Sequence, residues 1–287
     1  MINKKKNYKY KIILIIGVGK WGRTLTNFFL QSDWNVMYAT RDGKPNNEFE
    51  LFFSSKKLSH FNISKPFQFD LISICVKPSD IFLVWGKYKH LSFKFLIEKP
   101  GAKAIGELKK IFYEAKTENK LVFINYEFNY SKTTIMLKEK FINSINEIKS
   151  IELFWGKPMS EEGGLEWRLL PHMLAELFFL NPTNLTISYY RKNKQNLNLD
   201  GYFDQVPLSI TINESKFLNH YTTINLTNGG KLFKSREELL FNGKTVAKNS
   251  ISTLDRVLHL LNVSDKNIFK ENNYISEKVL NLIEQIK

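Results

Sequence analysis

Apolar blocks alternate with amphipathic stretches through the first 125 residues of the chain. Short runs rich in Ile, Leu, Val and Phe predict buried strands, and apolar residues spaced three or four positions apart predict helices. The expected strands cover residues 12–16, 34–40, 69–76, 93–97 and 121–125, and the expected helices cover 24–30, 79–88 and 105–119. Ser79 or Asp80 is expected to cap the second of these helices. Such alternation is typical of a doubly wound α/β domain with a parallel sheet.

The pattern changes after residue 125. Helices are expected at 131–143 and 169–180, and strands with polar breaks at 148–155, 185–191, 206–212, 221–226, 230–234 and 238–241. Helical patterns return at 252–261 and 276–286. We therefore expect an α/β domain over 1–124 and an α+β domain with a mostly antiparallel sheet over 125–287, whose last segment, about 252–287, packs back on the rest.

The first strand leads directly into a G-x-G-x-x-G turn formed by Gly17, Gly19 and Gly22. In a dinucleotide site the first glycine makes the tight turn, the second lets backbone N–H groups approach a pyrophosphate, and the third lets the helix pack close to the strand. The N-terminus of the following helix then attracts the anionic phosphates. Lys20 and Trp21 lie inside this turn. We expect all five residues to contact a dinucleotide, so the first domain is predicted to be a Rossmann domain.

The end of the second strand decides which dinucleotide binds. An acidic residue there accepts hydrogen bonds from the ribose 2′-OH of NAD, whereas a basic residue pairs with the 2′-phosphate of NADP. This chain has Thr40 and Arg41 at that point, with Lys44 close by. A guanidinium binds phosphate through two parallel hydrogen bonds, so NADP(H) is favoured. If the strand ends one residue later, Asp42 could reach the ribose instead, so NAD(H) stays the alternative.

Composition limits the other classes of function. The chain has 287 residues, 42 of them basic and 28 acidic, which gives a net charge of +14. The excess lysine is spread along the chain and forms no basic stripe with interleaved aromatic residues, so no nucleic-acid partner is expected. The single cysteine, Cys75, lies in a strand-like run, so neither an internal disulfide nor a cysteine zinc cluster is expected. No apolar run approaches the ~18 residues of a membrane helix, so we expect a cytoplasmic protein without a membrane or metal partner.

Four features in order resemble the Gfo/Idh/MocA family of oxidoreductases over nearly the whole chain. They are the glycine turn, Lys77-Pro78 at a strand end, Glu98-Lys99-Pro100 at another strand end, and Gly163-Gly164 followed by His172. The resemblance implies a nicotinamide-dependent oxidoreductase. It also implies that a Rossmann domain is joined to a domain with a large open sheet, through which many members associate, so a homodimer or homotetramer is expected.

The resemblance also assigns residues. Lys99 matches the lysine that lies between nicotinamide and substrate, and His172 matches the histidine that acts as acid or base on the reacting hydroxyl. Imidazole suits that role because its ordinary pKa lies near neutrality. Lys77, Pro78, Glu98 and Lys99 are expected at the cofactor, and Tyr126, Trp167, Arg168 and His172 at a small-molecule substrate.

Arg168 departs from the family pattern, which usually has an aspartate four residues before the histidine. A guanidinium removes an acceptor and adds donors that favour a carboxylate or phosphate. The substrate is therefore expected to be carbohydrate-like and anionic, such as a sugar acid or a nucleotide sugar. Two alternatives stay open: reduction of an imine or a conjugated double bond, and a catalytically silent NADP-binding sensor or scaffold.

Overall fold

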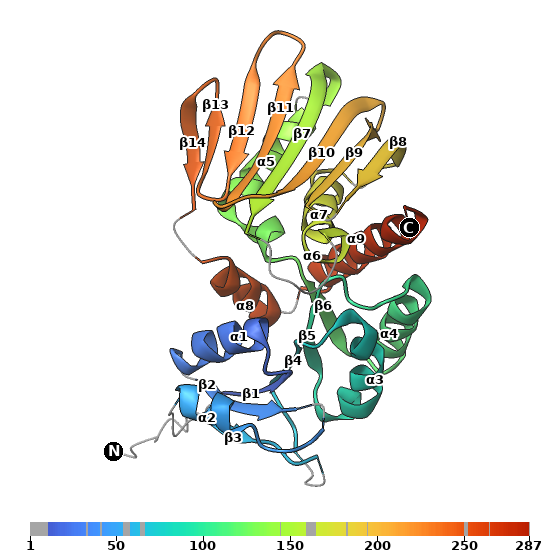
Figure 1. Cartoon of the computed structure of the whole chain (residues 1–287). Coiled ribbons are helices and arrows are strands. Elements are labelled where there is room, and N and C mark those ends of the chain that lie inside the picture. The colour runs from blue at the N-terminus through green and yellow to red at the C-terminus, as the bar shows by residue number, and fades with distance from the viewer. Residues whose placement is uncertain are drawn as a thin grey trace, which may run out of the picture. The chain divides into compact units, whose positions relative to one another are not determined.

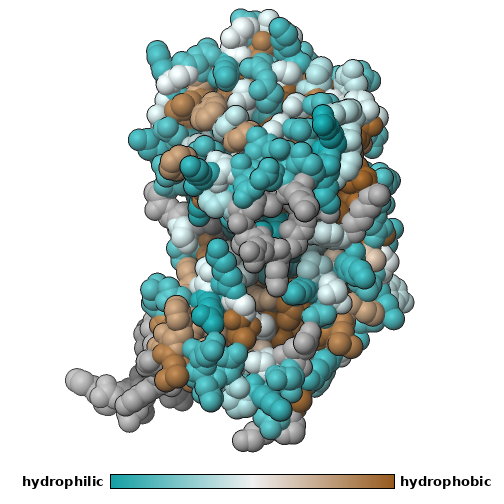
Figure 2. Space-filling model, in the orientation of Figure 1, coloured by the Kyte–Doolittle hydropathy of each residue, from teal (hydrophilic) through white to brown (hydrophobic). Residues whose placement is uncertain are grey.

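The computed structural model describes residues 11–286 except 33, 41, 54–57, 64–66, 144, 159–164, 182, 194, 250–251 and 264. The chain divides into two compact units, Met1–Asn125 and Tyr126–Lys287, called here the N-terminal and C-terminal units. Within the described ranges, every helix is too short or too polar to cross a bilayer. Figure 2 shows hydrophilic residues over most of the visible face of each unit, with hydrophobic residues scattered among them.

The N-terminal unit contains a six-stranded sheet in the order β3-β2-β1-β4-β5-β6, and each pair of neighbouring strands is parallel (Figure 1). α1 packs on β1 and β2, and α3 packs on α4. This is the doubly wound sheet that the sequence predicts. Its elements are β1 (Lys11–Ile16), α1 (Lys20–Leu30), β2 (Trp34–Ala39), α2 (Asn47–Phe53), β3 (Leu58–His60), β4 (Leu71–Ile74), α3 (Pro78–Tyr88), η1 (Lys89–Leu91), β5 (Lys94–Glu98), α4 (Ile105–Thr117) and β6 (Leu121–Asn125).

The register of this sheet aligns the carboxyl ends of its strands. Ile16 of β1 pairs with Ala39 of β2 and with Ile74 of β4, and Ile74 pairs with Ile97 of β5. Strands β1, β4, β5 and β6 are buried on both faces along most of their length, as their continuous apolar runs predict. The loops that follow β1, β2, β4 and β5 therefore leave the sheet at one edge. That edge is where α/β sheets bind ligands, beside the point at which the strand order reverses between β1 and β4.

The C-terminal unit contains an eight-stranded sheet in the order β14-β13-β12-β11-β7-β10-β9-β8. Only the central pair β7 and β10 is parallel among the pairings of this sheet in the described residues. The sheet is therefore mostly antiparallel, as predicted. Its elements are η2 (Glu127–Tyr130), α5 (Lys132–Asn143), η3 (Ile145–Glu147), β7 (Ile148–Lys157), α6 (Leu165–Arg168), α7 (Leu170–Leu180), β8 (Leu185–Lys192), β9 (Asn196–Phe203), β10 (Val206–Glu214), β11 (Asn219–Leu226), β12 (Lys231–Ser235), β13 (Glu238–Phe241), β14 (Lys244–Lys248), α8 (Thr253–Val263) and α9 (Lys266–Gln285).

Helix α7 lies at the centre of this unit. Its sequence LPHMLAELFFL is apolar almost all round, and every residue except His172 is buried. It packs against α5 and α9, and its buried Glu176 bonds to the sheet (Figure 1). An apolar helix of this kind forms the core of a unit and does not lie on its surface. The half-buried His172 therefore projects from a rigid helix.

Several elements differ from the sequence-based expectation. The N-cap of α3 is Lys77, and neither Ser79 nor Asp80 caps it, because Pro78 occupies the first helical position with its pre-set φ. Helix α9 begins at Lys266, ten residues before its predicted start. α2, β3, β9 and β14 were not expected from the sequence.

Candidate active site

The glycine turn after β1 is tightly built. Gly17 has φ +103°, which favours glycine, and a Cβ there would lie 2.6 Å from the carbonyl oxygen of Cys75. A Cβ on Gly22 would lie 1.9 Å from the carbonyl oxygen of Gly17. The Gly17 N–H donates to the Ala39 carbonyl at 3.0 Å. The first and third glycines are therefore required by the close approach of the backbone.

Gly19 differs from its two neighbours, because a Cβ there would meet no atom within 4 Å. It is the N-cap of α1, it supplies no capping side chain, and the first turn of α1 contains no acidic residue. The N–H groups of the first helical turn have no partner within the helix. The space above Gly19 and the positive end of α1 therefore suit a diphosphate. Lys20 is exposed and Trp21 is half-buried at the same turn.

The end of β2 bears on the choice of coenzyme. β2 ends at Ala39, so Thr40 is the first residue after it, and Arg41 lies outside the described residues. Thr40 Oγ1 donates to the Lys44 carbonyl at 2.6 Å, and the Lys44 N–H donates to Asp42 Oδ1 at 3.3 Å. Hydrogen bonds from Thr40 and from the Lys44 N–H lower the pKa of the exposed Asp42 carboxyl. This turn thus presents both a carboxylate and a lysine, and the geometry favours neither coenzyme.

Two further motifs lie at the same edge of the sheet. Lys77 and Pro78 follow β4 and begin α3. Glu98 ends β5, pairs with Asn125 of β6 in register, and accepts a hydrogen bond from Asn125 Nδ2 at 2.7 Å. Lys99 follows it with a cis peptide bond to Pro100. The register therefore brings the Lys77-Pro78 and Glu98-Lys99 motifs to the edge that carries the glycine turn.

Cys75 lies beside the turn, and its thiol is a weak nucleophile. Burial, together with the charge of Glu98, raises the pKa of its thiol. It therefore stays protonated near neutral pH and is a packing residue, as the sequence indicates.

In the C-terminal unit, His172 lies among aromatic rings. Its ring centre is 5.2 Å from that of Phe128, 5.5 Å from that of Trp155 and 6.3 Å from that of Tyr126. His220 stacks on Trp155 at 4.3 Å and meets Phe128 at 5.6 Å. We call Phe128, Trp155, His172 and His220 the aromatic cluster. The predicted residues Tyr126 and His172 therefore do come together.

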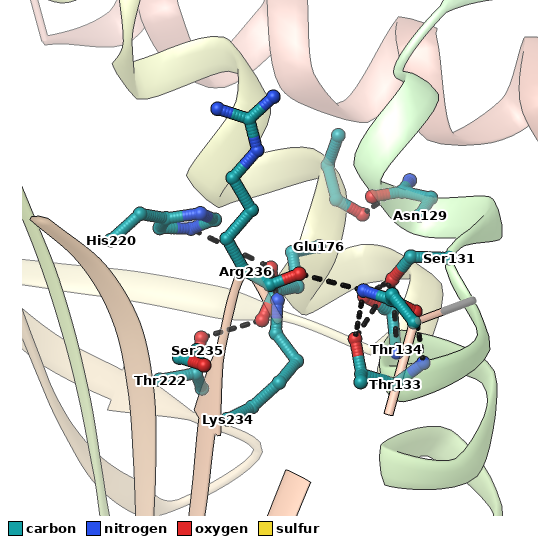
Figure 3. Close-up of polar contacts among 12 residues, drawn as sticks. Asn129, Ser131, Thr133, Thr134, Glu176, His220, Thr222, Lys234, Ser235 and Arg236 are labelled. Atoms are coloured by element: carbon teal, nitrogen blue, oxygen red, sulfur yellow. Dashed lines mark hydrogen bonds and ion pairs between the residues drawn. The ribbon is translucent and has the colours of Figure 1, made fainter. Parts of the chain in front are cut away.

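A buried ion pair of Glu176 and Lys234 lies beside His220 of this cluster (Figure 3). Glu176 lies one helical turn after His172, so their side chains share a face of α7. Glu176 Oε2 accepts from Lys234 Nζ at 2.7 Å, and its Oε1 accepts from Thr222 Oγ1 at 2.5 Å. The ion pair connects α7 to β12, and the Thr222 hydrogen bond connects it to β11. It therefore holds the helix that carries His172 in register with the sheet.

The charges of this pair follow from their surroundings. Burial would raise the pKa of Glu176, but the charge of Lys234 and the hydrogen bonds from Lys234 and Thr222 hold it below its ordinary value. Burial and the neighbouring Lys234 lower the pKa of His220 to about 3. His220 is therefore neutral near pH 7, and its 3.8 Å approach to Glu176 is not an ion pair. The charged partner of Glu176 is Lys234.

Trp167 and Arg168 belong to α6, directly before α7, and both are half-buried. Gly163 and Gly164 lie outside the described residues. Sequence reasoning missed Phe128 and Trp155, which have no motif, and it gave no functional role to His220, which the structure places in the core. The described residues contain no group of three His, Cys, Asp or Glu side chains that could hold a metal ion.

Comparison with known proteins defines the fold. No family model and no curated protein sequence matches the chain. A Gfo/Idh/MocA family oxidoreductase from Vibrio cholerae is 12% identical with a TM-score of 0.72, and the alignment covers 96% of this chain and 98% of that one. The chain shares the fold of this Gfo/Idh/MocA family member. The predicted resemblance is thus confirmed at the level of the fold.

Two other solved structures are similar to this chain in fold. One is the UDP-N-acetylglucosamine 3-dehydrogenase GnnA from Acidithiobacillus ferrooxidans, which is 13% identical with a TM-score of 0.73 over 96% of each chain. The other is GenD2 from gentamicin A biosynthesis, in complex with NAD, which is 8% identical with a TM-score of 0.76 over 96% of this chain and 93% of that one.

Proposed function

We propose that this protein is a nicotinamide-dependent oxidoreductase that transfers a hydride between the coenzyme and a carbohydrate-like, anionic substrate. The observation that carries the proposal is the glycine turn at the β1–α1 junction, which is open only above Gly19 and lies at the switch point of the parallel sheet. Of the solved structures that share the fold, one is named as an oxidoreductase and another as a dehydrogenase, and GenD2 holds NAD.

In this proposal the turn residues and the N-terminus of α1 hold the diphosphate, and Thr40, Lys77, Pro78 and Glu98 line the same edge of the sheet. The coenzyme supplies or accepts the hydride. The Lys99 ammonium holds the reacting oxygen of the substrate and stabilises the negative charge that develops there. His172 accepts or returns the proton of that oxygen. The ion pair of Glu176 and Lys234 keeps the helix of His172 in place.

We propose NADP(H) as the preferred coenzyme, because Arg41 and Lys44 follow β2. NAD(H) is the alternative, and Asp42 supports it. The comparison to make is the dissociation constant of NADPH against that of NADH, in the wild type and in Arg41→Gln. If the wild type binds NADPH more tightly than NADH and Arg41→Gln does not, the proposal is supported. Equal or tighter binding of NADH by the wild type contradicts it.

Arg168 supports an anionic substrate such as a sugar acid or a nucleotide sugar. It equally supports a second candidate function, a catalytically silent coenzyme-binding sensor or scaffold, because it replaces the expected aspartate. Reduction of an imine or a conjugated double bond by the same unit is the remaining alternative. A panel of oxidised sugar acids, oxidised nucleotide sugars and cyclic imines separates the three functions, with consumption of the reduced coenzyme read from its absorbance. Consumption with the sugars supports the oxidoreductase acting on an anionic sugar, and consumption with the imines supports the imine reductase. No consumption with any of them supports the sensor or scaffold.

The mechanism is tested with Lys99→Ala and His172→Ala. Each is expected to lower kcat at least about 100-fold, the lower range for a positioned acid–base group, while coenzyme affinity changes little. Near-normal turnover in either variant removes that residue from the mechanism.

We also propose that the protein is a homo-oligomer joined through the open sheet. Phe154 stacks on Tyr221 at 4.9 Å, and Tyr221 contacts Phe233 at 5.5 Å. Side chains alternate along a strand, so these rings lie on the face opposite Trp155 and His220. Sedimentation should show a dimer or tetramer, and a monomer at all concentrations contradicts this arrangement. A cytoplasmic location stays a prediction.

A further inference from the structure

Arg236 places a positive charge beside the aromatic cluster. It follows β12, two residues after Lys234, and its guanidinium carbon lies 5.8 Å from the centre of the Phe128 ring. The same ring lies 5.2 Å from His172. Arg236 and His172 therefore contact one ring, although 64 positions separate them in the sequence.

The charge of Arg236 is not neutralised within this group of side chains. Lys234 is buried and paired with Glu176, and the low pKa of His220 keeps that histidine uncharged. Of the carboxylates in the described part of the chain, none forms an ion pair with Arg236. In Figure 3 its guanidinium points away from the pair of Glu176 and Lys234. The residue is exposed, so a dissolved ligand can reach it.

The backbone at Arg236 is firmly held. Its carbonyl accepts a hydrogen bond from Asn249 Nδ2 at 2.7 Å, and the same amide nitrogen donates to Thr133 Oγ1 at 3.0 Å. Ser235 Oγ accepts the N–H groups of Glu237 and Glu238 at 3.2 and 3.1 Å. The short turn between β12 and β13 is therefore anchored to α5 on one side and closed by Ser235 on the other. These hydrogen bonds fix the backbone from which the Arg236 side chain extends.

From these observations we propose that Arg236 is a specificity-determining residue, which binds a carboxylate or phosphate group of the substrate while His172 acts at its reacting oxygen. The inference rests on the proposed function, and it identifies a residue of the anion site in addition to Arg168. The planar fork of a guanidinium matches both anions.

The test uses D-glucuronate, D-glucose 6-phosphate and D-glucose, which differ only at C6, together with UDP-glucose. Binding of each to the full-length protein with bound NADPH is measured by calorimetry. The wild type should bind at least one of the anionic sugars at least about 10-fold more tightly than glucose, since a hydrogen bond to a charged group contributes about 1.5–3 kcal/mol. Which anionic sugar binds best tells a carboxylate site from a phosphate site.

Three variants complete the test. Arg236→Gln should lower the affinity for the preferred anionic sugar about 10- to 100-fold and leave that for glucose unchanged. Arg236→Lys should recover part of the loss, because it restores the charge without the fork. Arg191→Gln, which changes an exposed arginine of β8, should have no effect. Thermal unfolding of all three variants confirms that each is folded.

The assignment is overturned if the wild type does not prefer any anionic sugar, if Arg236→Gln keeps the preference, or if that variant weakens glucose binding equally. Coenzyme oxidation is measured separately. If no substrate is turned over but the preference depends on Arg236, the proposed function fails and the anion site stands. If turnover is seen and Arg236→Gln changes no preference, the oxidoreductase stands and the anion site fails.

Discussion

Gly19 and Gly22 allow the binding role of the turn to be separated from its structural role. Gly19→Ala should fold normally, because the added methyl group meets nothing within 4 Å and the φ of −69° is open to alanine. Alanine is a poorer N-cap than glycine, so the free energy of unfolding should fall by no more than about 1 kcal/mol. Gly22→Ala should be destabilised, because its methyl group would lie 1.9 Å from the Gly17 carbonyl oxygen. Overpacking of this kind typically costs about 1–3 kcal/mol.

Coenzyme binding is expected to change in Gly19→Ala even though stability changes little. In Gly19→Ala the methyl group occupies the space that the diphosphate needs. Loss of one charge-assisted hydrogen bond, about 1.5–3 kcal/mol, raises the dissociation constant of NADPH or NADH about 10- to 100-fold. We expect this variant to keep its stability and lose its affinity.

The assay combines urea unfolding with a fluorescence titration of the reduced coenzyme. The control is Gly106→Ala, which changes a glycine near the start of α4 where a Cβ also meets nothing. It should bind the coenzyme like the wild type. If Gly19→Ala binds as tightly as that control, the space above Gly19 is not a phosphate site and the reasoning is refuted.

Three further predictions concern stability. Lys234→Met should lower the unfolding free energy by about 3–5 kcal/mol in urea, because it leaves Glu176 buried without its charged partner; a loss below about 1 kcal/mol would contradict the buried pair. His220→Phe should flatten the acid side of the stability–pH profile. The folded-state pKa of about 3 lies below the ordinary 6.5, so only the unfolded chain takes up this proton between those values, and stability falls as the pH falls, by up to about 1.4 kcal/mol per pH unit; identical profiles for variant and wild type would refute this. Gly86→Ala, in the last turn of α3 with nothing near its Cβ, should raise stability by up to about 1 kcal/mol, and a lower melting temperature would show that the helix is not built as described.

The sequence predicts most of the N-terminal unit because the signals for its strands and turns lie in short, continuous segments. The run from Ile12 to Ile16 carries its own strand signal, and the three glycines mark the turn that follows. The missed elements lack such a signal. Strand β9 reads NLNLDGYF, which is polar and contains glycine, and its structure comes from pairing with β8 and β10. The first half of α9 is rich in Lys and Asn, so its apolar face is hard to see in the sequence.

The residues of the candidate site likewise fall into those that the sequence predicts and those that it does not. Lys99 and His172 lie in short motifs that can be recognised along the chain. The group around Glu176 cannot be recognised there, because sheet register assembles it: Trp155 pairs with His220 across two strands, and Thr222 pairs with Lys234 across the next two. No spacing in the sequence indicates that these residues meet. The sequence likewise does not indicate that Arg236 lies beside Phe128, because the turn after β12 brings these two residues together.

The central claim is that this chain moves a hydride between a nicotinamide and a sugar carbon. The most direct measurement is incubation with coenzyme deuterated at the transferable position of C4, together with oxidised sugar acids and nucleotide sugars, followed by mass spectrometry of the products. We expect one deuterium on the carbon that bears the new hydroxyl, formed by the wild type and lost in Lys99→Ala. Unlabelled sugars and unconsumed coenzyme throughout, with the coenzyme bound, would contradict it.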